Sequence, residues 1–224
     1  MADNRLTWDE TGKKLYETGV DRAVLYLQDE TGAYVNGVAW NGLTGISESP
    51  SGGEETALYA NNNKYGSLRS NEEFGGTIKA YTYPDEWNNC DGSKELTKGL
   101  TAKQQVRSVF GLTYRSLIGN DTKATEYGYR LHFVYGATTS PAQKDRTTVN
   151  DSPEAIELSY DFTTTAVPIT GMKPASHIEL DSTQVDPKVL KAVEDVIYGS
   201  ATAKARLPLP DEIKSIMEQA ASQE

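Results

Sequence analysis

The side chains best suited to chemistry are scarce in this sequence of 224 residues, which has two histidines and one cysteine. His132 and His177 each fall on the polar face of a stretch that alternates polar and apolar residues. We therefore expect both to be exposed strand residues, not catalytic bases or metal ligands. Cys90 has no second cysteine to pair with inside the chain. A zinc site would have to depend largely on carboxylates, so no metal site is predicted.

Neighbouring carboxylates are the remaining candidates for acid–base chemistry. They are Glu54–Glu55, Glu72–Glu73 and Glu194–Asp195. A glycoside hydrolase needs two carboxylates that face each other across a cleft, whereas neighbours on a strand point to opposite faces. We interpret these pairs as solvated surface charge. The sequence also lacks a phosphate-binding Gly-rich loop, a dinucleotide-binding GxGxxG, a GxSxG and an HExxH motif, so we predict no catalytic residue and no cofactor.

Composition excludes some classes of protein. The formal net charge is −10, with 32 acidic against 22 basic residues, whereas a protein that grips DNA neutralises phosphates with clustered Lys and Arg. The polar residues 1–8 lack the apolar core of a signal peptide, and no apolar run approaches the ~20 residues of a membrane span. We expect a protein that is made in the cytoplasm, stays soluble there and does not bind a membrane. Its 13 Tyr against 4 Phe favour half-buried strands and interfaces.

The elements that must position these residues are mostly strands. Residues 20–182 are predicted to form one antiparallel β domain. In the clearest strand, 156–162, Glu157, Ser159 and Asp161 alternate with apolar residues. The other expected strands are 22–28, 34–46, 76–83, 106–118, 127–135 and 176–180. Residues 101–110 stay ambiguous, because Thr101 and Gln104 could form a helix-capping box while the residues from Val106 alternate like a strand.

A long loop interrupts the strand pattern at residues 47–73, with turn-forming residues at 49–53 and 61–63. It also carries apolar side chains that a purely solvated loop does not need, namely Leu58, Tyr59, Tyr65 and Leu68. We predict that this loop docks on another surface.

Helices are expected at two places. Residues 84–92 begin with Pro and two acids and end with Gly, which predicts a short helix. From residue 183 the chain forms a helical tail, in which Asp186 is a natural N-cap and Pro187 follows at the first helical position. The apolar stripe predicted to dock this helix is Val189, Leu190, Val193, Val196 and Ile197. After a Leu-Pro-Leu-Pro loop, a last amphipathic segment opens at Asp211. The tail must pack on the sheet or on a neighbouring subunit, because it is too small to own a core.

Several segments resemble the major tail protein family of siphophages and prophages of Gram-positive bacteria. They are residues 6–20 (LTWDETGKKLYETGV), 37–43 (GVAWNGL), 49–54 (SPSGGE), 118–122 (IGNDT), 131–136 (LHFVYG) and 150–155 (NDSPEA), and the Leu-Pro-Leu-Pro tail also fits. The resemblance runs from about Leu6 to at least Leu180. One departure is Ala124, where the family pattern has Gly, and this puts the geometry of that turn in question.

The resemblance implies a tail tube fold, a β-sandwich or barrel-like domain with a C-terminal helical extension. Such subunits join into rings, usually hexameric, whose inner sheets merge into one barrel, and the rings stack into the tube that conducts DNA during ejection. About four strands from each of six subunits would give on the order of 24, more than the 16 to 18 that already leave an aqueous channel. The implied partners are further copies of this chain, the tape measure protein in the lumen, tail terminator and distal tail proteins at the ends, and passing viral DNA.

These implications assign roles to particular segments. Unpaired strand edges would form the ring interface, and the 47–73 loop would stack one ring on the next. An N-terminal arm, residues 1–19, and the tail from 183 to 224 would clasp neighbours. Glu157 and Asp161 are the candidates for an acidic lumen wall that repels phosphate. The protein would thus reside in the virion as part of the tail tube.

Two other readings stay open besides the hydrolase that uses paired carboxylates. A carbohydrate-binding or adhesin-like β-sandwich would use Tyr and Trp on its strands to stack sugars. A contractile tail or secretion-system tube shares the tube architecture, although the matching segments favour the non-contractile tail.

Overall fold

The computed structural model describes residues 5–149, 151 and 154–222. The first four residues of the expected N-terminal arm and part of the 150–155 segment lie outside this range. The strands are β1 Leu15–Gln28, β2 Tyr34–Ala39, β3 Leu43–Glu48, β4 Ser51–Gly52, β5 Glu55–Ala60, β6 Asn63–Arg69, β7 Glu72–Glu73, β8 Gly75–Ala80, β9 Lys94–Thr97, β10 Leu100–Ala102, β11 Phe110–Asn120, β12 Ala124–Thr139, β13 Leu158–Thr164 and β14 His177–Asp181. The helices are the 3-10 helix η1 Asp85–Asn89, α1 Pro187–Ile197 and α2 Pro210–Ala221. The prediction of a mainly antiparallel β fold with a short helix and a helical C-terminal part is confirmed.

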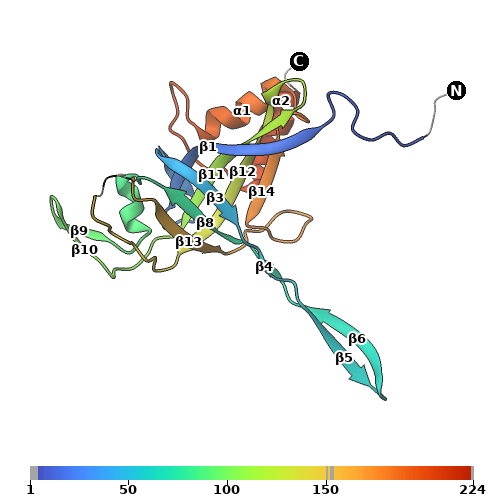
Figure 1. Ribbon diagram of the computed structural model, residues 1–224, viewed down its shortest axis with the longest axis horizontal. Helices are drawn as coiled ribbons and strands as arrows, with labels where there is room; N and C mark the ends of the chain where they lie inside the picture. Colours follow the sequence, from blue (N-terminus) through green and yellow to red (C-terminus); the bar gives the residue numbers. More distant parts are fainter. Residues whose placement is uncertain (1–4, 150, 152–153, 223–224) are drawn as a thin grey trace.

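The main sheet has the strand order β2-β1-β11-β12-β13-β8-β3, with β14 also paired to β12 (Figure 1). Strand β12 changes partner along its length, because residues 130–134 pair with β14 and residues 137–139 pair with β13. Gly136 lies at this change with φ of +60°. A Cβ atom there would lie 2.3 Å from the carbonyl oxygen of Thr165, so only glycine fits.

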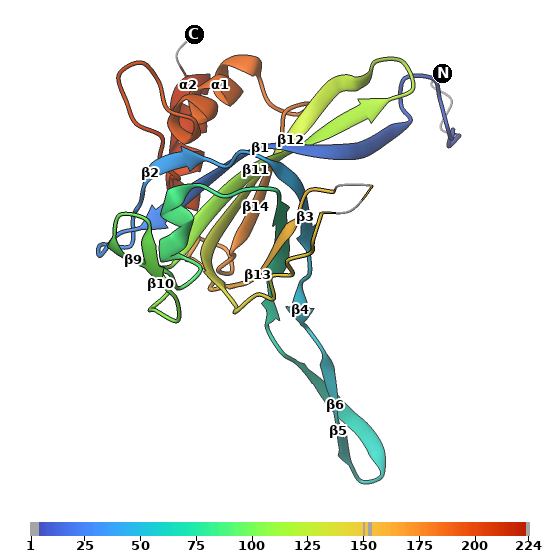
Figure 2. The same ribbon diagram turned by 60° about the vertical axis from the view of Figure 1, so that its left-hand side comes forward.

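One face of β1, β11 and β12 is covered by β13, β8 and β3, which pack across it (Figure 2). Trp87 of η1 lies fully buried at the centre of this first core, with its ring centroid 4.5 Å from that of Trp40 and 5.0 Å from that of Tyr160. Close aromatic packing of this kind stabilises a core beyond the burial of area alone. Cys90 is buried in the same core, and burial raises the pKa of its thiol to about 12.

The opposite face of the sheet is covered by the helical tail. Val193 and Ile197 of α1 share a second core with Phe133 and Tyr135 of β12, and the Tyr26 hydroxyl donates to the carbonyl oxygen of Ile197 over 2.6 Å. Of the predicted docking stripe, Val189, Leu190, Val193 and Ile197 are buried and Val196 is partly buried. The tail therefore packs on the sheet of its own chain.

Local chemistry explains where α1 begins and ends. The Asp186 side chain accepts a hydrogen bond of 2.8 Å from the Lys188 backbone N–H, and Pro187 follows it as the first helical residue. Gly199, with φ of +81°, lies just beyond the C-terminal end. The sequence signals for this helix are thus realised in the structure.

The N-terminal arm is shorter than the predicted 1–19, because β1 begins at Leu15 and pairs with the end of β11 opposite Asn120.

The turn between β11 and β12 contains Ala124, the residue that departs from the family pattern. The Asn120 side-chain oxygen accepts hydrogen bonds from the backbone N–H groups of Thr122 and Lys123, and Ala124 then adopts φ of +48°. This left-handed conformation is the one that favours glycine after a three-residue turn.

The prediction of a long loop at residues 47–73 is wrong, because the structure forms a hairpin there. Strand β3 continues to Glu48, and residues 51–73 then form two short antiparallel ladders, β4 with β7 and β5 with β6. Asn61 and Asn62 make the tip, with φ values of +49° and +64°, as a two-residue hairpin turn requires. Figures 1 and 2 both show this projecting hairpin, residues 51–73, reaching away from the rest of the molecule.

The ambiguous residues 101–110 form no helix. Residues 100–102 pair with β9, the next residues form no regular element, with φ of +66° at Gln104, and β11 begins only at Phe110. Val106 is almost fully exposed and precedes the strand. The strand expected at 106–118 is therefore present as β11, but it begins four residues later. In the described part of the chain, no helix combines the length and the apolar character that a bilayer crossing requires.

Candidate functional site

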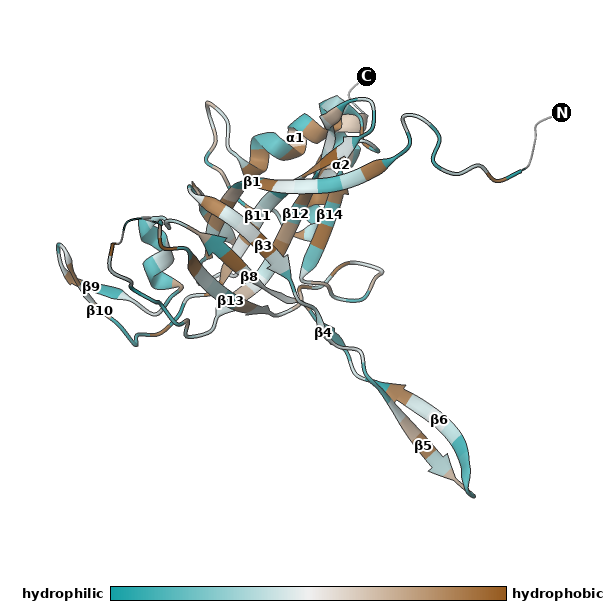
Figure 3. Ribbon diagram, in the orientation of Figure 1, coloured by the Kyte–Doolittle hydropathy of each residue, from teal (hydrophilic) through white to brown (hydrophobic). Residues whose placement is uncertain are grey.

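The projecting hairpin exposes a set of large apolar side chains. Leu58, Tyr59, Tyr65 and Leu68 are between 40% and 80% exposed, and Figure 3 shows hydrophobic colouring on the hairpin strands. A two-stranded hairpin is marginal in water without a face to pack on. Exposed apolar groups gathered on one element commonly mark a contact surface. The structure therefore places all four predicted docking residues on one free element.

A narrow neck joins the projecting hairpin to the body. The β4–β7 ladder is only two residues long on each strand. Gly52 has φ of +81°, and a Cβ atom there would lie 2.3 Å from the Asn71 carbonyl oxygen, while the Gly53 N–H donates to the same oxygen over 3.3 Å. The strong local twist therefore depends on glycine. The neck sets the direction in which the projecting hairpin points.

The main sheet has open edges, among them those of β3 and β14. In the described part of the chain, β3 pairs only with β8, and β14 pairs only with β12. The outer edge of β2 is covered instead, because the Gly37 N–H donates to Ala205 O over 2.8 Å and the Leu207 N–H donates to Tyr34 O over 3.1 Å. Unpaired edges are templates for pairing with another chain. The edges of β3 and β14 are therefore available for association, as is the outer edge of β1 before Val24.

The two predicted lumen residues lie on the exposed face of the β13–β8–β3 part of the sheet. Glu157 accepts a hydrogen bond from Thr44 Oγ1, and Asp161 accepts one from Thr77 Oγ1, each over 2.6 Å. Both carboxylates are exposed, whereas Tyr160 and Phe162 between and beside them point into the first core. The alternation expected for this strand is thus present.

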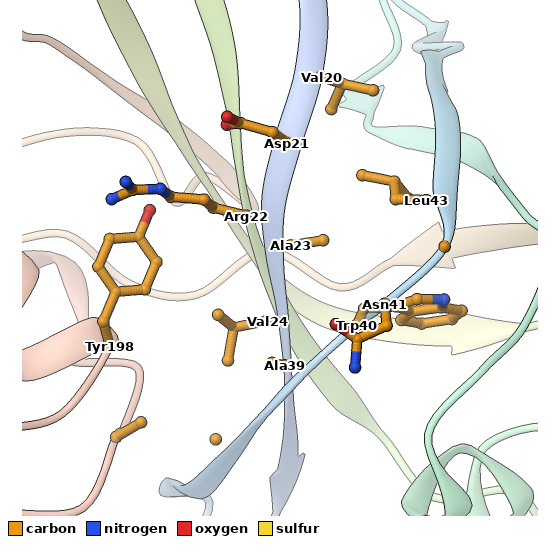
Figure 4. A pocket seen from close by; sticks show the side chains of 13 residues that line it. Val20, Asp21, Arg22, Ala23, Val24, Ala39, Trp40, Asn41, Leu43 and Tyr198 are labelled. Atoms are coloured by element: carbon orange, nitrogen blue, oxygen red, sulfur yellow. The ribbon is translucent and has the colours of Figure 1, made fainter.

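A pocket lies beside β1, bounded by the β2–β3 connection and by Tyr198 at the end of α1 (Figure 4). Asp21 is the single acid that lines it, and this carboxylate is held by the Arg115 guanidinium through bonds of 2.7 and 2.5 Å. The Arg22 guanidinium lies 6.0 Å from the centre of the Tyr198 ring. Hydrolysis by two carboxylates needs a second acid across the cleft, so this pocket does not offer that chemistry.

The three carboxylate pairs do not converge on a cleft. Glu54, Glu55, Glu72 and Glu73 are all exposed along the projecting hairpin. On α1, Glu194 accepts a hydrogen bond of 2.7 Å from the Tyr129 hydroxyl, and Asp195 pairs with Lys191 at 2.7 Å. These contacts agree with the interpretation of the pairs as surface charge.

The expectation that both histidines are exposed is wrong. His132 is 3% exposed and His177 is half-buried, and their rings lie near the carboxylate of Glu48. The reason is that β3 and β8 cover the side of β12 that the alternation marks as polar. Sequence reasoning missed Glu48 altogether, because only the fold brings the end of β3 beside β12. The signal in the sequence that could have indicated this group was the presence of one histidine on each of two predicted strands.

The tryptophans weigh against a sugar-binding platform. Trp40 and Trp87 are buried in the first core, and Trp40 Nε1 donates to the carbonyl oxygen of Thr82 over 2.9 Å. Rings that stack sugars must be reachable from solvent. Trp8, near the N-terminus, is the tryptophan that is exposed. A carbohydrate-binding role would thus depend on Trp8 and on tyrosines, without the other two tryptophans.

Comparison with known proteins adds no assignment. A scan against protein-family models matched none, and a search of curated proteins found no match. The resemblance to major tail proteins therefore stays a prediction, and function must be inferred from the surfaces described above.

Proposed function

We propose that this chain is a structural subunit of a phage tail tube, which joins copies of itself into rings and stacks the rings through the projecting hairpin. The observation that carries this proposal is the projecting hairpin itself. Its four apolar side chains, Leu58, Tyr59, Tyr65 and Leu68, contribute to neither core of the body. A second copy would give them a surface to bury against. The role is structural and requires no catalytic residue or cofactor.

The open edges of β3 and β14 support ring formation. They belong to different parts of one sheet, so contact between them would be head-to-tail. A head-to-tail contact that closes on itself produces a ring, and one that does not close produces a filament. Pairing at these edges would also remove the aggregation hazard that they present in a lone copy. Six copies are the number that the family resemblance implies.

The exposed acidic face supports a bore that carries DNA. Asp161 of β13 and Glu157, the residue before this strand, are both exposed, and the chain as a whole carries a net charge of −10. Carboxylates on the lumen wall would repel phosphate, so DNA could pass without binding. The tape measure protein would occupy this bore before DNA does, with terminator and distal tail proteins at the two ends. The protein would reside in the virion after assembly in the host cytoplasm.

Removal of the projecting hairpin tests the proposal directly. Residues 54–70 can be replaced by Asn-Gly, because the backbones of Gly53 and Asn71 are already hydrogen bonded and that dipeptide forms a tight turn. The variant should keep the wild-type circular dichroism spectrum and should form rings or monomers, but no tubes, in electron micrographs of concentrated protein.

Two outcomes would contradict the proposal. Tubes of normal length from the hairpin-deleted variant would remove the stacking role. A wild-type chain that stays monomeric at high concentration on gel filtration, and that binds members of a glycan array, would instead favour the carbohydrate-binding alternative.

A further inference from the structure

Two histidines and a glutamate meet at the edge of the first core, on three different strands. His132 Nδ1 of β12 lies 3.1 Å from His177 Nε2 of β14 and 3.6 Å from Glu48 Oε1 of β3. The three donor atoms all lie within 4.8 Å of one another. No other group of three such side chains comes together among the described residues. The arrangement is thus a single place at which metal-binding donor atoms converge.

These separations suit one small cation. Zinc binds histidine nitrogen at about 2.0–2.1 Å and carboxylate oxygen at about 2.0–2.2 Å in tetrahedral geometry, which puts neighbouring donor atoms about 3.3 Å apart. The observed separations of 3.1 and 3.6 Å from His132 Nδ1 lie on either side of that value. A cation between the three atoms would require only small rotations of the side chains.

Neighbouring residues hold the donors in position. Ser116 Oγ lies 2.9 Å from His132 Nε2, which leaves Nδ1 directed at the group, and the Tyr114 hydroxyl donates to Glu48 Oε1 over 2.6 Å. Such outer contacts fix the tautomer and orientation of metal ligands.

The histidine rings are also clamped between aromatic rings. Tyr114 stacks on His132 with centroids 4.4 Å apart, the two histidines stack at 5.4 Å, and Phe74 stacks on His177 at 4.3 Å. Four rings therefore form one continuous stack across β11, β12, β14 and the residue before β8. Because the rings are already ordered, a bound ion would cost little side-chain entropy.

The surroundings of the two imidazoles are partly apolar and partly charged. Burial lowers the pKa of His132 to about 4 and lowers that of His177 as well. Glu179 adds a second carboxylate, with Oε1 3.7 Å from His132 Nδ1. The other oxygen of Glu179, Oε2, lies 3.4 Å from Arg130 Nε, so this carboxylate is also paired with a guanidinium.

We propose that Glu48, His132 and His177 form a binding site for a divalent transition-metal ion such as Zn²⁺, with water or Glu179 at the fourth position. Imidazole and carboxylate donors together suit zinc better than Ca²⁺ or Mg²⁺, which prefer oxygen alone. Glu48 is the last residue of β3, and two residues separate it from the projecting hairpin. The ion would therefore fasten the base of the hairpin to β12 and β14.

Zinc titration of the full chain, purified without a polyhistidine tag and treated with a chelator, tests the proposal. Isothermal titration calorimetry should give one ion per chain, and zinc should raise the midpoint of thermal unfolding. Co²⁺ in place of Zn²⁺ should give the visible absorption of a four-coordinate site. His177→Gln and Glu48→Gln should each weaken binding at least about tenfold. The matched control is Glu72→Gln, an exposed carboxylate on the projecting hairpin, which should bind as the wild type does.

Circular dichroism should show that both variants remain folded, since neither residue is fully buried. The absence of saturable zinc binding by the wild type would overturn the proposal and leave a hydrogen-bonded pair of neutral histidines. Equal binding by the wild type and both variants would also overturn it. Each measurement uses the unassembled chain, so failure to form tubes would leave this result unaffected.

Discussion

The β11–β12 pair and the β5–β6 pair are both antiparallel hairpins, but they differ in what covers them. In the body, β3, β8 and β13 cover one face of β11 and β12, and the helical tail covers the other. The β5–β6 pair has no cover of either kind in the described chain. Stability of a β ladder comes mainly from its packed faces. The comparison teaches that the faces of the body's sheet are covered within one copy, whereas those of the projecting hairpin are not.

Tyrosine shows the same contrast at the level of single residues. Tyr26 and Tyr135 are buried, and their hydroxyls donate to the carbonyl oxygens of Ile197 and Pro208 over 2.6 and 2.9 Å. Tyr59 and Tyr65 instead point their rings into solvent. One residue type therefore serves as a core component in the body and as an unpartnered surface in the hairpin.

Trp87→Ala should produce the largest change in the free energy of unfolding, and it would sharpen the comparison. The indole is fully buried against Trp40, Phe110 and Tyr160. Its loss leaves a cavity, so the free energy of unfolding should fall by about 3–5 kcal/mol in urea denaturation. A loss below about 1 kcal/mol would show that the first core can collapse around the gap and is not tightly packed.

Asp186→Ala should produce the next largest change in the free energy of unfolding. The substitution removes the side-chain acceptor of the Lys188 N–H at the start of α1, which should cost about 1 kcal/mol in the free energy of unfolding. Asp186→Asn is the matched control, because its side chain keeps an acceptor oxygen and should recover most of the loss. Equal losses in both variants would mean that the cap hydrogen bond does not stabilise the helical cover of the sheet.

Ala124→Gly should change stability in the opposite direction. The residue has φ of +48°, a conformation that costs a residue with a Cβ atom about 1–2 kcal/mol. Glycine removes that strain but adds freedom to the unfolded chain, so we expect a net gain of about 0.5 kcal/mol. Destabilisation by this substitution would show that the turn at the end of the body adopts another conformation.

Replacement of both Tyr59 and Tyr65 by Ser should have the smallest effect on the lone chain. Exposed side chains contribute little, so the free energy of unfolding should stay within about 0.5 kcal/mol of the wild type. Tube formation in electron micrographs should nevertheless be lost. The control is Lys64→Gln on the same hairpin, which should still assemble. A large loss of stability in the double variant would break the comparison, because it would mean that the hairpin packs on its own body.

Much of the fold followed from local patterns. The alternation of Glu157, Ser159 and Asp161 with apolar residues located β13, and Asp186 with Pro187 located the start of α1. These signals act within a few residues, so they can be recognised in a sequence. The paired hairpin at residues 51–73 could not be predicted in the same way, because its strands lack a buried face and therefore lack a clear alternation.

The candidate surfaces could be predicted in part. Leu58, Tyr59, Tyr65 and Leu68 were conspicuous because apolar residues are unusual among turn-forming ones. The position of His132 was misjudged, because alternation distinguishes two faces of a strand but cannot tell whether both are covered. Glu48 joins His132 and His177 only through the packing of β3 across β12, which depends on contacts between residues far apart in the sequence.

The burial of Cys90 has a practical consequence. Because its thiol lies inside the first core and burial raises its pKa to about 12, it should react very slowly with maleimides or iodoacetamides in the folded chain. A cysteine introduced at the tip, as in Asn62→Cys, would then be the one thiol open to labelling. A fluorophore placed there could follow, in real time, the moment at which the tip leaves water.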